Sequence, residues 1–160
     1  MRLSNRKKVP VYNFFNILLL MMLSAGSVCF IIDRMKFDVL EEKSYLLIII
    51  PIILLIINYL YGRQIFEYDS QGEALHFRNR NIVPFIDKPL SDEFPKYKLI
   101  KFEMVSVLFF RRLYVTVSSK NGGSAILKYE TSYLTKKEVN DLKTSLNNVI
   151  NANKEKRHQE

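Results

Sequence analysis

Residues that could carry acid–base or metal chemistry are few in this chain. The only histidines are His76 and His158, and the only cysteine is Cys29. Zinc sites need several Cys or His ligands at short spacing, so we expect no metal site. The adjacent acids Asp92 and Glu93 fall in a segment that we predict to be a loop, where solvation explains them better than catalysis. The sequence therefore predicts a protein that is not an enzyme, with no catalytic, cofactor-binding or metal-binding residues.

Basic side chains are the other candidates for function, since the net charge is +8. A lysine or arginine held near an anionic leaflet contributes about 1 kcal/mol to binding. The alternative is that these charges are simply solvated and help to set membrane topology. Nucleic acid binding is disfavoured because acidic residues interleave with the basic ones. We predict contacts with anionic lipid or a protein partner at seven positions: Arg78, Arg80, Lys96, Lys98, Lys101, Arg111 and Arg112.

Two long uncharged runs precede the part of the chain that holds these residues. They are "VPVYNFFNILLLMMLSAGSVCFII" and "SYLLIIIPIILLIINYLYG". A helix needs roughly 20 apolar residues to cross a hydrocarbon core of about 30 Å, and both runs reach that length. The rest of the chain is too short and too polar to surround two helices that are apolar on all faces. We predict transmembrane helices over residues 11–32 and 44–62, joined by an extracytoplasmic connector over 33–43.

The charges flanking these runs predict their orientation. Residues 1–10 carry four basic side chains and no acid, so by the positive-inside rule they stay in the cytoplasm. Two crossings return the chain to the cytoplasm, which places both termini there. The alternative is a cleaved signal peptide, with Ala25, Gly26 and Ser27 near the cleavage site. Apolar sequence continues beyond these residues to spanning length, which favours a retained helix.

Alternating apolar residues after residue 64 predict five strands. The first two are "QIFEYD" and "EALHFRN", joined by the turn sequence "DSQG". The segment from residue 80 to 97 contains three prolines and is expected to be irregular. The next two strands are "KLIKFEMVSVLF" and "RRLYVTVSSK", and "KNGG" should form a turn before "SAILKYE".

A C-terminal helix follows the strands. Thr135 and Glu138 have the spacing of a capping box, which satisfies backbone donors at a helix start. An apolar stripe then predicts a helix packed on the sheet: Val139, Leu142, Leu146, Val149 and Ile150. We predict a globular domain over 64–153 and a frayed tail over 154–160, which has nothing to bury.

The order "YDSQGEALHF", then "PKYKLIKFEMVSVLFFRRLYVTVSSKNG", then "LTKKEVNDLKTSLNNVI" resembles the pleckstrin-homology-like (PH-like) domains of small bacterial inner-membrane proteins, which follow a two-helix transmembrane hairpin. The resemblance covers nearly the whole chain, although the tryptophan that often starts the middle strand is absent. It implies an α+β fold, a transmembrane hairpin followed by an antiparallel PH-like domain with a C-terminal amphipathic helix. It also implies a bacterial inner-membrane location, but no mechanism.

These features predict a membrane-anchored interaction module whose domain meets lipid headgroups or a protein partner at the cytoplasmic membrane face. One alternative is a toxin-immunity or other protective membrane protein. Another is an accessory subunit of a larger membrane assembly, suggested by Asn13, Asn16 and Asn58 in or near the spans. The sequence does not identify the partner, the physiological process or the oligomeric state.

Overall fold

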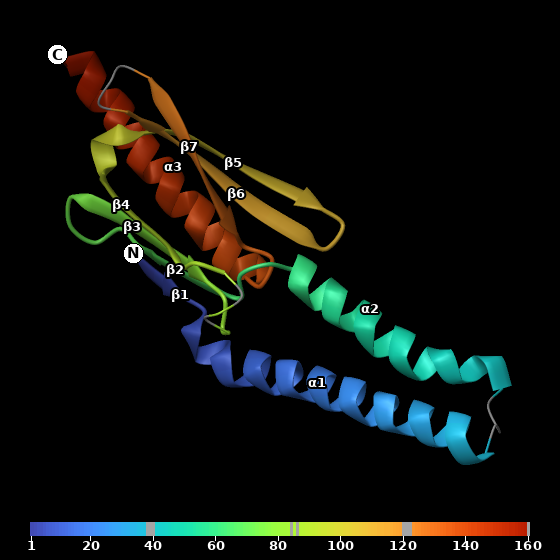
Figure 1. Ribbon diagram of the computed structural model, residues 1–160. Helices are drawn as coiled ribbons and strands as arrows, with labels where there is room; N and C mark the ends of the chain where they lie inside the picture. Colours follow the sequence, from blue (N-terminus) through green and yellow to red (C-terminus); the bar gives the residue numbers. More distant parts are fainter. Residues whose placement is uncertain (38–40, 84, 86, 120–122, 160) are drawn as a thin grey trace. The chain divides into compact units, whose positions relative to one another are not determined.

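The structure is a computed structural model that describes residues 1–37, 41–83, 85, 87–119 and 123–159. The chain divides into two compact units, coloured by sequence in Figure 1. The first, here called the β-rich unit, comprises Met1–Val9 and Tyr61–Glu160. The second, here called the helical hairpin, comprises Pro10–Leu60.

The helical hairpin contains two apolar helices. The α1 helix spans Val9–Ile32 and α2 spans Leu46–Leu60. A π-helical segment, Asp33–Phe37, follows α1, and a 3₁₀ segment, Glu41–Tyr45, precedes α2. Together with these flanking segments, the two helical stretches Arg6–Met35 and Lys43–Leu60 are long and apolar enough to cross a membrane. Most of the large apolar side chains of α1 and α2 are exposed. The predicted pair of spans therefore agrees with the helices, while residues 38–40 of the predicted connector lie outside the described residues.

Small and polar residues join the two helices of the hairpin. A Cβ added at Gly26 would lie 2.2 Å from the carbonyl oxygen of Leu47, so the helices approach closely only because residue 26 has no side chain. The Asn58 amide donates to Asn16 Oδ1 at 2.5 Å. In an apolar environment this bond satisfies groups that lipid cannot.

The β-rich unit contains seven strands in two antiparallel sheets. The first sheet has the order β1-β2-β3-β4, and the second has the order β5-β6-β7. The strands of the first sheet are Arg2–Ser4, Ile65–Asp69, Ala74–Arg80 and Leu90–Pro95. Those of the second sheet are Leu99–Val107, Phe110–Ser118 and Ser124–Glu130. The predicted mixed α+β composition and the five predicted strands are confirmed, and two further strands are present.

The first additional strand is β1, which precedes α1 in the chain and pairs with β2, which follows α2. Leu3 is buried opposite Tyr68. The buried Asn5 side chain accepts from Phe66 N at 2.8 Å and donates to Gln64 O at 2.7 Å, which extends the pairing by one residue. The helical hairpin is thus inserted between the first two strands of one sheet. The N-terminal segment, expected to stand apart from the globular domain, belongs to it.

The second additional strand is β4, which lies in the segment expected to be irregular. Leu90, Asp92 and Phe94 face inward, while Ser91 and Glu93 face outward. The strand pairs with β3 up to Pro95, opposite Ala74, and Lys96 N then donates to Glu73 O at 2.9 Å. The prediction of a loop for Asp92 and Glu93 was therefore wrong. The three prolines of the segment indicated a loop, although it contains a strand of six residues.

The predicted β2–β3 turn and the helix cap are present. Gly72 has φ of +77° in the β2–β3 turn, where Gln71 N donates to Asp69 Oδ1 at 2.8 Å. The predicted β6–β7 turn lies partly outside the described residues, but the two strands it joins are paired. At the start of α3, Thr135 and Glu138 exchange the two bonds of a capping box.

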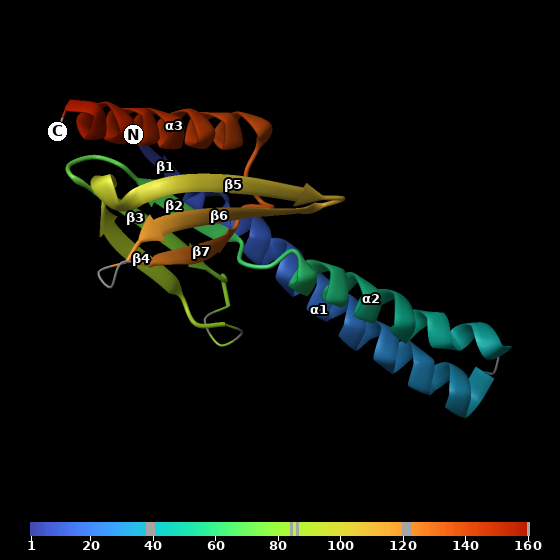
Figure 2. The same cartoon turned by 90° about the horizontal axis from the view of Figure 1, so that it is seen from above.

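The core lies between the two sheets and α3, Lys136–Gln159, which runs beside β5 (Figures 1 and 2). Phe77 is central, since its ring stacks on Tyr129 at 4.7 Å and on Phe94 at 5.7 Å between centroids. The predicted stripe on α3 supplies Leu142 and Leu146, both fully buried. The expected frayed tail is instead helical through Gln159.

Two buried asparagine side chains in this unit form hydrogen bonds with main-chain groups. Besides Asn5, Asn79 of β3 is fully buried and joins the two sheets at one corner. Its amide donates to Ile65 O and to Glu130 O, both at 3.1 Å, and its Oδ1 accepts from Glu130 N at 2.8 Å. Every hydrogen-bonding position of that side chain except one acceptor lone pair is therefore used on main chain.

Candidate functional site

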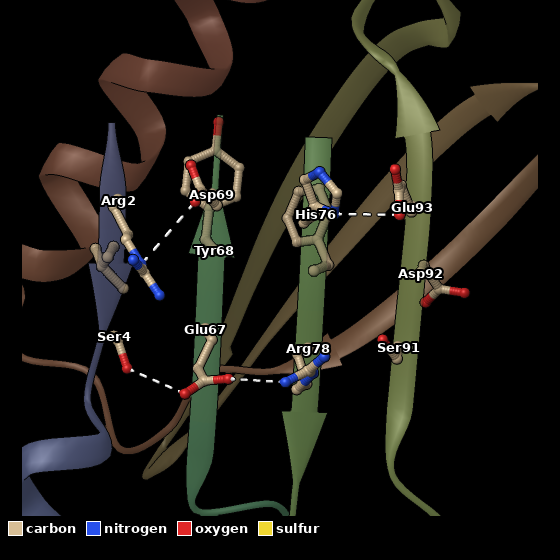
Figure 3. A pocket seen from close by; sticks show the side chains of 12 residues that line it. Arg2, Ser4, Glu67, Tyr68, Asp69, His76, Arg78, Ser91, Asp92 and Glu93 are labelled. Carbon is tan, nitrogen blue, oxygen red and sulfur yellow. Dashed lines mark hydrogen bonds and ion pairs between the residues drawn. The ribbon is translucent and has the colours of Figure 1, made fainter. Parts of the chain in front are cut away.

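The outer surface of the first sheet, here called the polar face, collects charged side chains from four strands (Figure 3). Alternation along each strand places these side chains outward while the intervening ones enter the core. They border a shallow hollow of about 290 Å³. The outward residues are Arg2, Ser4, Glu67, Asp69, His76, Arg78, Ser91 and Glu93.

Pairs across neighbouring strands occupy most of these charges. Arg2 lies 4.0 Å from Asp69, and Glu67 accepts from Ser4 at 3.4 Å and lies 3.8 Å from Arg78. His76 Nδ1 lies 3.4 Å from a Glu93 oxygen. Figure 3 shows these contacts running across the sheet as rungs between adjacent strands. The arrangement resembles ordinary cross-strand pairing, which stabilises a sheet modestly.

This face offers little catalytic chemistry. His76 and Glu93 are both largely exposed, so neither environment prepares a proton-transfer group. Among the described residues, no group of three or more His, Cys, Asp or Glu side chains is placed to hold a metal ion.

One titratable pair lies beneath the face. The buried Tyr129 hydroxyl donates to Asp92 Oδ2 at 2.8 Å, which joins β7 of one sheet to β4 of the other. Burial, the hydrogen bond and the nearby carboxylate together raise the pKa of Tyr129 well above its ordinary value. The pair is a structural bridge, because its tyrosine ring is enclosed by the core.

The seven predicted basic contact residues do not form one patch. Arg78 and Arg80 lie on β3, as predicted, with Arg78 paired to Glu67. Lys96 and Lys98 lie in a 3₁₀ turn between β4 and β5, so Lys98 precedes the strand that was predicted to begin with it. Lys101 is on β5 and is paired with Glu103 at 2.8 Å.

The remaining two, Arg111 and Arg112, are neighbours at the start of β6. Arg111 is half-buried and donates to the Leu134 carbonyl at 3.2 Å. The Arg112 side chain is exposed, and in the described part of the chain it has no hydrogen bond or ion pair. It is the predicted residue most available to bind an anion.

Beside these arginines the β5–β6 hairpin ends in an exposed apolar tip, Val107–Phe109, here called the apolar tip. Exposure reaches 58% for Val107, 88% for Leu108 and 68% for Phe109. Leu108 has φ of +52°, a left-handed conformation that costs an L-residue roughly 1–2 kcal/mol. Asparagine or glycine would occupy such a turn without this cost.

Sequence reasoning missed the apolar tip because it assigned "VLF", residues 107–109, to the end of a strand. The signal that could have found it was the lack of any Gly, Asn, Asp or Pro between two strands that must reverse direction. A turn made of leucine and phenylalanine is an exception to ordinary turn chemistry.

Comparisons with models of protein families, with curated proteins and with solved structures found no match to this chain. The candidate sites are therefore judged on their own geometry.

Proposed function

We propose that this protein is a non-enzymatic integral membrane protein that holds a PH-like interaction unit at the cytoplasmic face of the bacterial inner membrane. The observation that carries the proposal is the insertion of the helical hairpin between β1 and β2. Two antiparallel sheets followed by an amphipathic C-terminal helix fit the expected PH-like fold.

Pairing of β1 with β2 supports the placement of both hairpin ends on one side of the bilayer. Residues before α1 and residues after α2 belong to a single compact unit, which cannot assemble across a membrane. Lys8 Nζ also lies 2.9 Å from Glu138 at the start of α3. The basic residues Arg2, Arg6, Lys7 and Lys8 favour the cytoplasm for that side.

The same pairing supports retention of α1. Cleavage near Ala25 would remove β1, together with buried Leu3 and Asn5. The sheet would lose an edge strand, and Phe66 N would lose its partner. Retention of α1 therefore keeps the β-rich unit intact.

What the unit contacts is a protein partner or the headgroups of anionic lipids. Scattered basic side chains on a tethered domain favour lipid by about 1 kcal/mol for each one near the surface. The side-chain amides of Asn16 and Asn58, both in the predicted spans, hydrogen-bond each other within the hairpin. This bond supports a self-contained anchor more than an accessory subunit.

Two single cysteines in a Cys29→Ala background test the placement. A membrane-impermeant maleimide added to intact spheroplasts should label Lys43→Cys, in the connector, and should label Thr144→Cys, on α3, only after lysis. Intact mass should equal that of the whole chain. Labelling of Thr144→Cys without lysis, or a mass lacking the first span, would contradict the placement.

Co-purification tests the interaction. The full chain, extracted in mild detergent after crosslinking, should recover a protein or enriched anionic lipid that a tagged chain ending at Gly62 does not. The shorter chain keeps both helices and lacks the strands from β2 onward. Equal recovery by the two chains would refute an interaction role for the β-rich unit.

A further inference from the structure

The exposure of three apolar residues at the apolar tip is not explained by packing within the β-rich unit. Val107, Leu108 and Phe109 are consecutive, exposed and apolar, and they contribute nothing to the core between the sheets. Leu108 also holds a left-handed backbone conformation that its side chain disfavours. A costly conformation that presents an apolar side chain to solvent indicates that something covers the tip.

The position of the tip in the unit indicates what covers it. Phe110, the next residue, packs its ring 5.6 Å from the ring of Tyr61. Tyr61 is the first residue after α2, and its ring also lies 5.6 Å from Tyr133. Phe110, which directly follows the apolar tip, therefore contacts the residue at which the chain re-enters the β-rich unit. Aromatic clusters of this kind favour the headgroup layer of a bilayer.

Charge next to the tip agrees with a lipid surface. Arg112 lies opposite Val105 on β5 and opposite Glu130 on β7, two and three residues beyond Phe110 and Phe109. The Glu130 carboxylate accepts from Arg63 N rather than from Arg112. The Arg112 guanidinium has no partner among the described residues and is free to bind a phosphate. Apolar side chains flanked by an unpaired arginine form the pattern of an interfacial membrane contact.

We infer that the apolar tip inserts into the headgroup and upper acyl layer of the bilayer crossed by α1 and α2, with Arg112 on a lipid phosphate. The inference rests on the proposed function, because it requires that α2 span that bilayer. It adds a third attachment point, which would fix the orientation of the β-rich unit on the membrane. A second copy of the chain covering the tip is the competing outcome.

Lipid-quenching fluorescence on the full chain in vesicles tests this. In a Cys29→Ala background, Leu108→Cys carries an environment-sensitive dye, and the vesicles contain phosphatidylglycerol, phosphatidylcholine and a lipid with a quencher on its acyl chain. Ile126→Cys is the matched control, since Ile126 is 66% exposed on β7 of the same sheet, away from the tip. We expect blue-shifted, lipid-quenched emission at position 108 and neither effect at position 126.

Three results would overturn the inference. Emission at position 108 equal to that at 126 would mean that the tip stays in water. A blue shift without quenching by lipid would mean that protein, such as a second copy, covers the tip. Quenching unchanged by Arg112→Gln in the same vesicles would remove the phosphate contact.

The failure of this inference can be told apart from failure of the proposed function. Alkaline carbonate washing of the same vesicles should leave the protein in the membrane fraction. Release by carbonate would refute the membrane anchor itself. Retention together with an unquenched Leu108→Cys reporter would refute insertion of the tip alone.

Discussion

The polar face and the apolar tip are both exposed, yet they differ in what exposure leaves unsatisfied. On the polar face most outward charges lie beside a polar or oppositely charged side chain on the neighbouring strand, as Glu67 does between Ser4 and Arg78. On the apolar tip Leu108 and Phe109 have neither a polar partner nor a covering side chain. Water can hydrogen-bond to the charged groups of the polar face. Removing the apolar tip from water, by contrast, lowers the free energy.

The two surfaces differ in whether the fold itself explains them. Cross-strand ion pairs keep an edge-rich sheet in register and need no ligand. The apolar tip has no comparable role within the fold, and Leu108 even opposes the local backbone preference. The surface richest in titratable groups is therefore the less promising of the two. Substitutions ranked by their effect on folding test this contrast.

The largest effect is expected beneath both surfaces, at Asn79. Asn79→Leu should lower the free energy of unfolding of the β-rich unit by on the order of 3 kcal/mol, because three buried or partly buried main-chain groups lose their partner. Urea titration of the full chain in mild detergent, followed by limited proteolysis, measures the change. His76→Ala, an outward substitution on the same strand, is the control. An unchanged urea midpoint for Asn79→Leu would mean that this side chain does not join the sheets.

A smaller effect is expected at the Tyr129–Asp92 bridge. Tyr129→Phe should cost about 1 kcal/mol at neutral pH through the lost hydrogen bond. The raised pKa of Tyr129 adds a pH dependence, since above pH 10.0 the unfolded tyrosine releases its proton while the folded one keeps it. Stability of the wild-type chain should thus fall as pH rises past this value.

The Tyr129→Phe chain should lose less stability over the same alkaline range. Urea midpoints at neutral and alkaline pH give the comparison. Tyr97→Phe, at an exposed residue, controls for the loss of one phenol. An alkaline decline equally steep in Tyr129→Phe and wild type would assign it to other groups, such as Tyr68, whose pKa burial also raises.

The polar face itself should respond weakly. Arg78→Ala breaks an exposed contact with Glu67 and should change the free energy of unfolding by less than about 1 kcal/mol. The effect should shrink further at high salt, which screens exposed charges. The same urea titration, repeated with added sodium chloride, measures both. A loss as large as that of Asn79→Leu would show that the face contributes to folding as much as the interior does.

The smallest effect on folding is expected at the apolar tip. Leu108→Gly relieves the left-handed strain but increases the entropy of the unfolded chain, so the net change should stay within about 0.5 kcal/mol. Val115→Gly, at a fully buried residue of the same sheet, is the contrasting control. Strong destabilisation by Leu108→Gly would mean that the leucine packs inside the unit, and the contrast between the two surfaces would fail.

Much of the secondary structure was predictable because it depends on local pattern. Two uncharged runs of spanning length predicted α1 and α2, and the Thr135–Glu138 spacing predicted the start of α3. Period-two alternation predicted β2, β3, β5, β6 and β7. Each of these signals lies within one short stretch of chain, where composition decides the outcome.

The errors share one cause, which is dependence on distant partners. β1 has three residues and β4 has six, and each is a strand only because a neighbouring strand supplies its hydrogen bonds. The tail after residue 153 was expected to fray, yet α3 continues, and Asn153 donates to Lys96 O at 2.7 Å. The partners of β1 and Asn153 lie more than fifty residues away in the sequence, while β4 pairs with the strand that precedes it, from Asn79–Leu90 to Ala74–Pro95.

The sequence by itself determined that two helices prefer an apolar surrounding and that strands and an amphipathic helix follow, because hydrophobic periodicity is a local property. Only the tertiary structure decided that the chain before the first helix joins the sheet after the second, and that the predicted basic residues are dispersed. It also decided which exposed residues are left without a partner. Pairing across more than sixty residues and the direction of each side chain depend on how the sheets close, which no short stretch of sequence encodes.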